Sequence, residues 1–138
     1  MAVERFLDTN IFIRYFTKDD PVKAARCFEL IQRLKRGEER ATTSESVLAE
    51  VVYVLSSKRH YGLPRDVIRK HLGPVIELRG LRLSSKTLYL RALELYVAHE
   101  IDFEDALTAT HVELQGLKAV LSYDRGFDEI VGDAREEP

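Results

Sequence analysis

Short apolar runs alternate with stretches of helical hydrophobic periodicity along this chain, and this alternation constrains its fold more than any other feature. Strands are predicted at residues 3–7, 40–43 and 118–123, with a further extended segment at 75–83 that Gly80 interrupts. Helices are predicted between and after these strands, at residues 9–16, 21–36, 45–59, 64–72 and 103–115, and a further helix that Ser84 or Ser85 caps runs through residue 99. Because strands that alternate with helices favour a parallel sheet covered on both faces, the predicted fold class is α/β.

Several of the expected helix ends carry local signals. Pro21 suits the first turn of a helix, and Gly37 suits the residue that stops it. Ser44 is a predicted N-cap, as is Asp102, and Gly116 follows the last turn of the helix that Asp102 begins. These signals predict where the helices begin and end.

Length and composition favour one soluble domain. A chain of 138 residues is the usual size of a single domain, so we expect one domain over residues 1–138 without a linker. No apolar run approaches the roughly 20 residues that span a bilayer, and the first residues lack the apolar core of a signal peptide. We therefore expect a cytoplasmic protein that does not enter a membrane.

The single cysteine and the net charge exclude some classes of site. Cys27 has no second thiol to pair with, which excludes an internal disulfide and a multi-cysteine zinc site, and a buried structural thiol is its expected use. The net charge of −2 argues against a generally basic nucleic-acid-binding surface. Local contacts between the protein and phosphate beside a bound metal are compatible with this net charge.

Four carboxylates are placed where an α/β fold gathers a ligand site. Asp8 and Asp124 close two of the predicted strands, and ligands bind at the carboxyl ends of parallel strands. Glu50 and Asp105 interrupt the apolar faces of two predicted helices, where a carboxylate is costly unless a cation compensates its charge. A divalent metal ion is the obvious compensating cation.

Each of these carboxylates also has a structural explanation. Asp8 is a good N-cap for the helix that follows it. Asp124 is a candidate turn residue that bonds its own backbone, and Glu50 is a candidate partner for a lysine or arginine. Taken singly these alternatives stay open, whereas all four together are less expected.

Asp102 and Asp105 are separated by the helix face on which they lie. Asp102 fits the N-cap position, and acidic residues in a first turn also complement the helix dipole. Asp105 shares a face with Ala109 and Val112, four and seven residues later, so it points where the core is expected. Capping therefore does not explain a carboxylate at position 105.

An acidic pocket of this kind suits a hard divalent cation. Mg²⁺ and Mn²⁺ take oxygen ligands, keep several waters and are commonly held by a few carboxylates together with substrate phosphates. Such an ion activates water as a nucleophile and neutralises charge when a phosphodiester is cleaved. The four carboxylates thus point to metal-assisted phosphodiester chemistry.

Four segments resemble, in order and spacing, the motifs of a PIN domain. They lie at residues 6–12 (FLDTNIF), 46–52 (SVLAEVV), 102–107 (DFEDAL) and 122–128 (SYDRGFD). They are most similar to the VapC-type ribonuclease toxins of prokaryotic toxin-antitoxin modules. This resemblance covers nearly the whole chain and implies a three-layer α/β/α sandwich with a central parallel sheet.

The resemblance also implies an activity and a set of site residues. The implied activity is that of an endoribonuclease dependent on Mg²⁺ or Mn²⁺. By motif position Asp8, Glu50, Asp105 and Asp124 are the catalytic and metal-binding carboxylates. Asp128 matches a more variable acidic position, which is either a ligand of a second metal or a turn residue.

Further expectations concern the surroundings of the site and the partners. By resemblance Asn10 and Ser122 orient ligands or waters from outside the metal's own ligand set. The family typically forms homodimers and binds a cognate antitoxin, whose C-terminal segment lies over the active-site groove. Arg14, Lys18 and Arg125 are candidates for contact with RNA phosphates, although a solvated surface or a salt bridge is an equal alternative.

Other readings of the same chain remain open. The fold is compatible with a catalytically silent module that binds RNA or protein. An aspartate-nucleophile phosphotransfer domain is less favoured, because it needs a second acid soon after Asp8 and a lysine after Asp124. The four histidines show no metal-ligand spacing and are expected in structural or surface positions. Apolar residues of the early helices, such as Phe12 and Tyr53, serve either the core or a partner groove.

Overall fold

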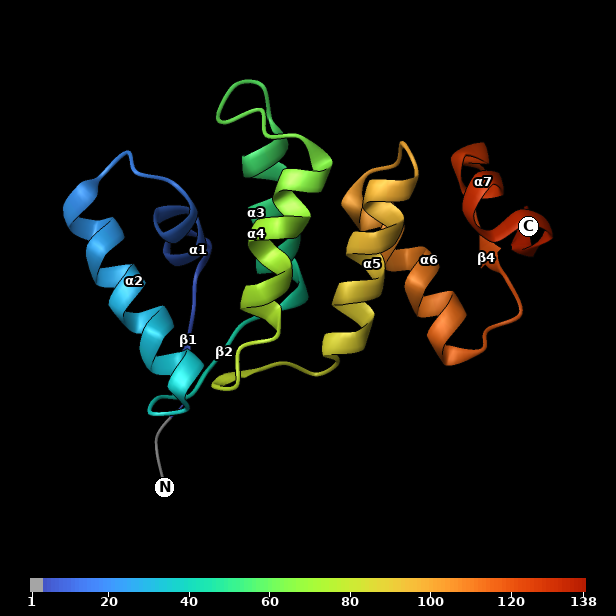
Figure 1. The fold of residues 1–138 in the computed structure, drawn as a ribbon. Coiled ribbons are helices and arrows are strands. Elements are labelled where there is room, and N and C mark those ends of the chain that lie inside the picture. Colours follow the sequence, from blue (N-terminus) through green and yellow to red (C-terminus); the bar gives the residue numbers. More distant parts are fainter. Residues whose placement is uncertain (1–3) are drawn as a thin grey trace. The chain divides into compact units, whose positions relative to one another are not determined.

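The computed structural model describes residues 4–138 and divides the chain into two compact units. One unit ends at Ser84 and the other spans Ser85–Pro138. Figure 1 colours both along the sequence, with the first unit running from blue to green-yellow.

The first unit is built on a parallel sheet with the strand order β1-β2-β3. Parallel pairing requires a crossover between successive strands, and pairs of helices supply both crossovers. In the register, Arg5 is opposite Ala41 and Ala41 is opposite Leu81. The elements are β1 (Arg5–Phe6), α1 (Thr9–Phe16), α2 (Pro21–Arg36), β2 (Ala41–Thr42), α3 (Glu45–Ser56), α4 (Arg65–Ile76) and β3 (Leu81–Arg82).

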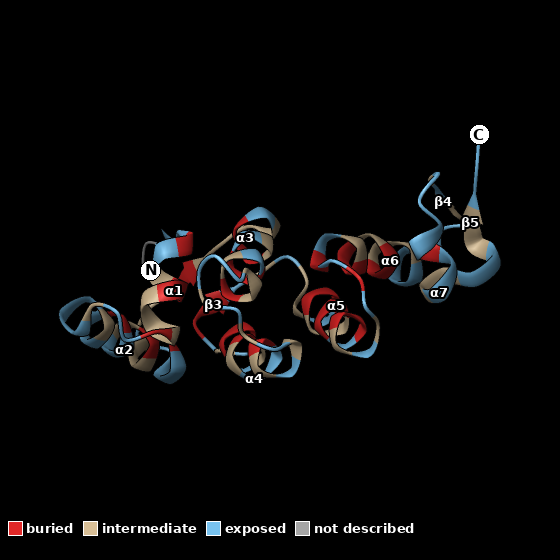
Figure 2. Cartoon of the chain, turned by 90° about the horizontal axis from the view of Figure 1, so that it is seen from above, coloured by how far each residue is buried: buried red, intermediate tan, exposed pale blue. Residues whose placement is uncertain are grey.

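The core of this unit consists of aliphatic side chains that the helices bury. Leu34 of α2, Leu48 and Leu55 of α3, and Ile68 and Leu72 of α4 are fully buried. Buried residues lie along one side of a helix such as α4 (Figure 2), as amphipathic periodicity requires. This core positions the end of β1, after which Asp8 follows, and the helix α3, whose middle carries Glu50.

The second unit pairs two helices and a small two-stranded parallel sheet. The helices α5 and α6 pack together, with the rings of Tyr96 and Phe103 edge to face and their centroids 5.9 Å apart. Val120 of β4 is opposite Arg135 of β5. The elements are α5 (Lys86–Ala98), α6 (Phe103–Gln115), β4 (Val120–Leu121), η1 (Arg125–Phe127), α7 (Asp128–Val131), η2 (Gly132–Ala134) and β5 (Arg135–Glu136).

Local signals place the helix ends correctly in several cases. The Ser44 hydroxyl accepts a hydrogen bond from the Val47 amide at 3.2 Å, and α2 and α6 end at Gly37 and Gly116, both with left-handed backbone. Asp102 occupies the N-cap of α6 as expected, but its side chain makes no capping hydrogen bond. The expectation of a side-chain cap at Asp102 is therefore wrong.

The strands and two helix boundaries differ from the sequence expectations. Each strand is two residues long, and Val3 of the first expected strand lies outside the described residues. The helix expected over 45–59 ends at Ser56. The helix α4 continues to Ile76, because Val75 and Ile76 extend the buried stripe of Ile68 and Leu72 at helical spacing. The elements after η1 were not predicted.

Two further findings bear on surfaces. Phe12 is fully buried, so it serves the core, whereas the Tyr53 side chain is 64% exposed on α3. In the part of the chain described, residues 4–138, every helix is too short or too polar to cross a bilayer.

Candidate active site

Asp8 stands where β1 passes into α1. The preceding residue, Leu7, is buried and donates its amide to the Thr42 carbonyl at 2.8 Å, while its own carbonyl accepts from the Thr43 hydroxyl at 2.8 Å. Asp8 is the N-cap residue of α1, yet its exposed side chain makes no capping hydrogen bond. The capping alternative for this carboxylate is therefore wrong, and the carboxylate is available to a ligand.

Glu50 is held beside Asp8 by the next residue in the chain. The Thr9 hydroxyl, on a side chain only 7% exposed, donates to Glu50 Oε2 at 2.7 Å. Glu50 itself is exposed and forms no ion pair with any of residues 4–138. The salt-bridge alternative is thus not observed. Thr9 orients the carboxylate through Oε2, and Oε1 does not take part in this hydrogen bond.

Both carboxylates line one cavity of about 540 Å³ in the first unit. Its wall combines three carboxylates, two small polar side chains, one basic residue, two aromatic residues and two aliphatic residues. The lining residues are Asp8, Thr9, Asn10, Ile13, Arg14, Asp19, Glu50, Val54, His60 and Tyr61. The expected residues Asp8, Asn10, Arg14 and Glu50 therefore meet at one place.

Asp105 is half-buried in the first turn of α6, in the second unit. Its pKa is raised, chiefly because burial disfavours the charged carboxylate and then because Asp124 places a negative charge nearby. The charges of Asp102 and Glu104 act in the same direction. Asp105 and Asp124 therefore form a second pair of interacting carboxylates. None of the groups that shift the pKa of Asp105 is a cation.

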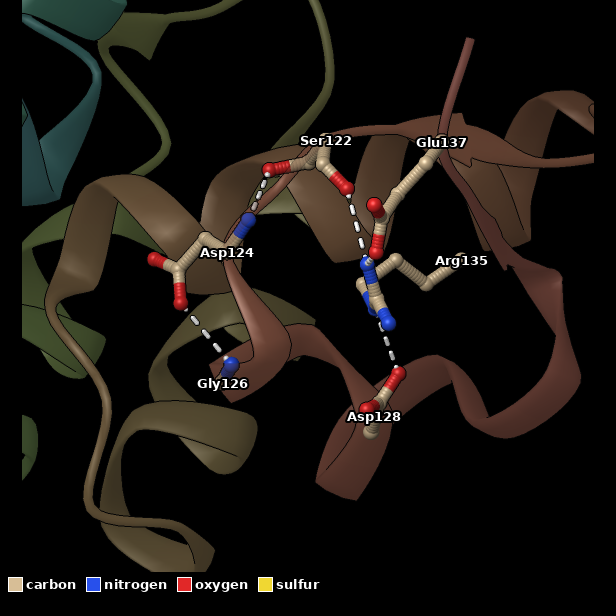
Figure 3. A network of polar contacts seen from close by, with 6 residues as sticks. All are labelled: Ser122, Asp124, Gly126, Asp128, Arg135 and Glu137. Atoms are coloured by element: carbon tan, nitrogen blue, oxygen red, sulfur yellow. Dashed lines mark hydrogen bonds and ion pairs between the residues drawn. The ribbon is translucent and has the colours of Figure 1, made fainter.

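Asp124 bonds the backbone of its own turn (Figure 3). Its Oδ1 accepts from the Gly126 amide at 2.8 Å, and its own amide donates to the Ser122 hydroxyl at 2.9 Å. The turn alternative for Asp124 is therefore correct for one carboxylate oxygen. Ser122 fixes the backbone from which this carboxylate projects.

Asp128 is engaged by an arginine that the sequence reading did not single out. Arg135 Nε donates to Asp128 Oδ1 at 2.6 Å, and its Nη1 bonds the Ser122 carbonyl at 3.0 Å and Glu137 at 2.9 Å (Figure 3). The Arg135 side chain is only 12% exposed. Arg135 lies seven positions after Asp128, so no local spacing signals this ion pair before the chain folds.

The other expected RNA contacts differ in exposure. Arg14 is half-buried in the cavity wall, whereas Lys18 and Arg125 are exposed. None of the three forms an ion pair within residues 4–138, so the salt-bridge alternative is not observed for them.

The donor set suits a divalent cation. Residues 4–138 contain no cluster of three or more side chains placed to hold a metal; instead Asp8 and Glu50 meet in one unit, and Asp105 and Asp124 in the other. All four offer the hard oxygen ligands that Mg²⁺ and Mn²⁺ prefer. The pKa of Asp105 is raised first by burial and then by neighbouring negative charge, and a bound cation would offset both effects.

Comparison with known proteins shows the family to which this chain belongs. A protein named VapC ribonuclease, from Aquifex aeolicus (strain VF5), is 22% identical over 126 residues, which cover 91% of this chain and 91% of that protein. Residues 5–133 match the sequence profile of the PIN domain. This match confirms the α/β fold class expected from the sequence. Because it spans nearly the whole chain, this protein belongs to the PIN domain family.

Proposed function

We propose that this protein is an endoribonuclease that hydrolyses RNA phosphodiester bonds with the help of Mg²⁺ or Mn²⁺. The observation that carries the proposal is the first unit's cavity, in which Asp8 is free of capping bonds and Glu50 is oriented by Thr9. Membership of the PIN family and similarity to a VapC ribonuclease support it. Asp105 and Asp124 complete the proposed set of catalytic carboxylates.

The residues of the chain contribute orientation and charge. A bound divalent ion supplies activation of water and neutralisation of the phosphate charge. The carboxylates proposed as metal ligands are Asp8 and Glu50 in the first unit and Asp105 and Asp124 in the second. An acidic surface repels phosphate when it is empty and would accept phosphate once a cation is bound. Thr9 restricts Glu50 to one orientation, which lowers the entropy lost when the carboxylate binds its ligand.

Asn10, Ser122 and Asp128 have supporting tasks in this proposal. Asn10 lines the cavity and would orient a water or ligand there, and Ser122 holds the amide of Asp124. Asp128 is paired with Arg135, which favours a turn-stabilising use over a place in a second metal site.

The biological setting is proposed on the same basis. We propose that the protein is the toxin of a type II toxin-antitoxin pair, acts in the cytoplasm, forms a homodimer and is inhibited by a cognate antitoxin. Similarity to a VapC ribonuclease supports this proposal.

Replacing Asp8 with asparagine tests the proposed function. The Asp8→Asn side chain keeps the shape but loses the negative charge that a metal ligand needs, so Mg²⁺-dependent cleavage of single-stranded RNA should fall by about 100-fold or more. Asp66→Asn is the matched control, since Asp66 is an exposed aspartate of α4 outside the cavity. Circular dichroism should show both variants folded.

The outcomes separate the competing functions. Wild-type cleavage rates in Asp8→Asn would exclude the proposal. A folded wild-type protein that fails to bind Mn²⁺ in calorimetry would favour a silent binding module. A phosphoryl group trapped on Asp8 would favour the phosphotransfer reading.

A further inference from the structure

The cavity that contains Asp8 and Glu50 extends to residues that hydrolysis does not require. Beyond the carboxylates its wall includes the aliphatic residues Ile13 and Val54, the basic residue Arg14 and the aromatic residues His60 and Tyr61. A volume of about 540 Å³ lies within the usual range for small-ligand pockets of about 300–1,000 Å³. The wall is mainly polar, and Ile13, Val54 and Tyr61 form the part of it that suits the face of a flat heterocycle.

Tyr61 is held in position by contacts rather than left on a loose loop. Its hydroxyl donates to Asp19 Oδ2, which ties the turn after α3 to the segment between α1 and α2. The turn is closed by hydrogen bonds from the His60 and Gly62 amides to the Ser57 carbonyl, both at 2.9 Å. The bond to Asp19 and burial raise the pKa of Tyr61, so its phenol remains a neutral donor at physiological pH.

Arg14 supplies a positive charge to a cavity with three carboxylates in its wall. It is half-buried and forms no ion pair among residues 4–138. A partly buried arginine without a carboxylate partner is well suited to pair with a phosphate group, which accepts two parallel hydrogen bonds from a guanidinium. The anion it would bind lies in the same cavity as the proposed metal ligands.

We propose that this part of the cavity is a subsite for an unpaired RNA base next to the scissile phosphate. The Tyr61 ring provides the stacking surface, Ile13 and Val54 provide apolar contact, and Arg14 pairs with a neighbouring phosphate. This inference rests on the proposed ribonuclease function. Sequence-specific RNA recognition mostly targets unpaired bases stacked on aromatic side chains, so the substrate is single-stranded or looped at this nucleotide.

The test measures RNA binding without cleavage. A dye-labelled, single-stranded oligoribonucleotide is titrated against the Asp8→Asn protein in Mg²⁺, and fluorescence anisotropy gives Kd. Adding Tyr61→Leu should weaken binding by about 5- to 100-fold, the usual effect of losing one base–aromatic stack. Tyr61→Phe keeps the stacking ring and loses the hydroxyl bond to Asp19, while the backbone bonds to Ser57 still hold the turn. Its Kd should therefore stay within about 3-fold of the starting value.

The matched control and a second variant make the result specific. Tyr53→Leu removes an exposed tyrosine of α3 that does not line the cavity and should leave Kd unchanged. Arg14→Gln should reduce the slope of log Kd against log salt concentration by about one ion, because one phosphate contact is lost. This variant leaves Tyr61 intact and keeps the proposal testable if Tyr61→Leu does not fold.

Three results would overturn the subsite. They are equal Kd values for folded Tyr61→Leu and Tyr53→Leu, a loss in Tyr61→Phe as large as in Tyr61→Leu, or an unchanged salt slope in Arg14→Gln. Failure of the proposed function is read separately, from absence of Mg²⁺-dependent RNA cleavage by the wild-type protein. If the wild-type protein cleaves RNA normally and Tyr61→Leu leaves Kd unchanged, the base subsite is excluded and the proposed function is not.

Discussion

Burial and neighbouring negative charge act in the same direction on Asp105. Its carboxylate is half-buried in the first turn of α6, and Asp124, Asp102 and Glu104 add negative charge around it. The helix dipole at this end favours an acidic residue, but the raised pKa indicates that burial and repulsion outweigh this help. An ionisable group with a shifted pKa is typical of functional sites, where a charged side chain is kept although it lowers the stability of the fold.

At the residue scale, Asp105→Asn should therefore stabilise the metal-free protein while abolishing RNA cleavage. The raised pKa means that the folded state resists ionisation, so wild type loses stability relative to the variant as pH rises through the ordinary aspartate value of 3.8 and then the raised one. We expect the variant's Tm to exceed that of wild type by roughly 2–5 °C at pH 7 and to match it near pH 3. Melting curves in EDTA at both pH values, with an RNA cleavage assay, measure this. A lower Tm at pH 7 would contradict it.

The backbone of Gly80 connects three elements of the first unit, namely α2, β2 and β3. Its amide donates to the Leu34 carbonyl of α2 at 2.8 Å, and its carbonyl accepts from the Ala41 amide of β2 at 2.9 Å. It also immediately precedes β3, so it sets the approach of that strand to the sheet. A Cβ at this position would lie 2.2 Å from the Glu39 carbonyl oxygen, a distance that backbone atoms cannot accept without moving.

At the element scale, Gly80→Ala should destabilise the first unit by about 3 kcal/mol or more, because overpacking against backbone cannot be relieved by a rotamer change. Gly73→Ala is the matched control. Gly73 lies inside α4, and apart from its chain neighbours nothing lies within 4 Å of an added Cβ, so the change should alter stability by less than about 1 kcal/mol, because the helix propensity gained is opposed by crowding against Pro74. Urea denaturation of both variants measures the difference. Equal free energies of unfolding would contradict the junction described for Gly80.

At the scale of the whole molecule, metal binding and stability should be linked. A cation that binds the folded chain and not the unfolded one stabilises it by about 2.7 kcal/mol at a concentration 100 times Kd. We therefore expect Mn²⁺ to raise the Tm of the wild-type protein by several degrees relative to EDTA. The rise should be smaller in Asp8→Asn and should shrink as pH falls toward the raised pKa of Asp105, because metal ligands must be deprotonated.

The control for this coupling is Asp66→Asn, which should keep the full Mn²⁺ effect because its carboxylate lies outside the cavity. Thermal melts with and without Mn²⁺, at several pH values, provide the measurement. A Tm rise of equal size in Asp8→Asn would remove Asp8 from the metal ligands.

Much of the fold at the level of elements follows from local sequence signals. The bounds of α1, α2 and α6 agree with the expectation, because periodicity and end signals such as Gly37 and Gly116 act within a few residues. The strands came out shorter than expected, because their extent depends on which partner they pair with. The region after Asp124 was not predicted, since its turns and β5 are short and lack periodicity.

The sequence by itself determined the alternation of elements, the helix ends and the residue types of the candidate site. Only the tertiary structure decided what each side chain is free to do. Asp8 and Asp124 look alike in the sequence, yet one is free of capping bonds and the other bonds the Gly126 amide. Tyr61 meets Asp19 across 42 residues, which no local pattern records. The physical reason is that helix ends depend on neighbours within one turn, whereas a side chain's availability depends on contacts that form only when distant segments pack.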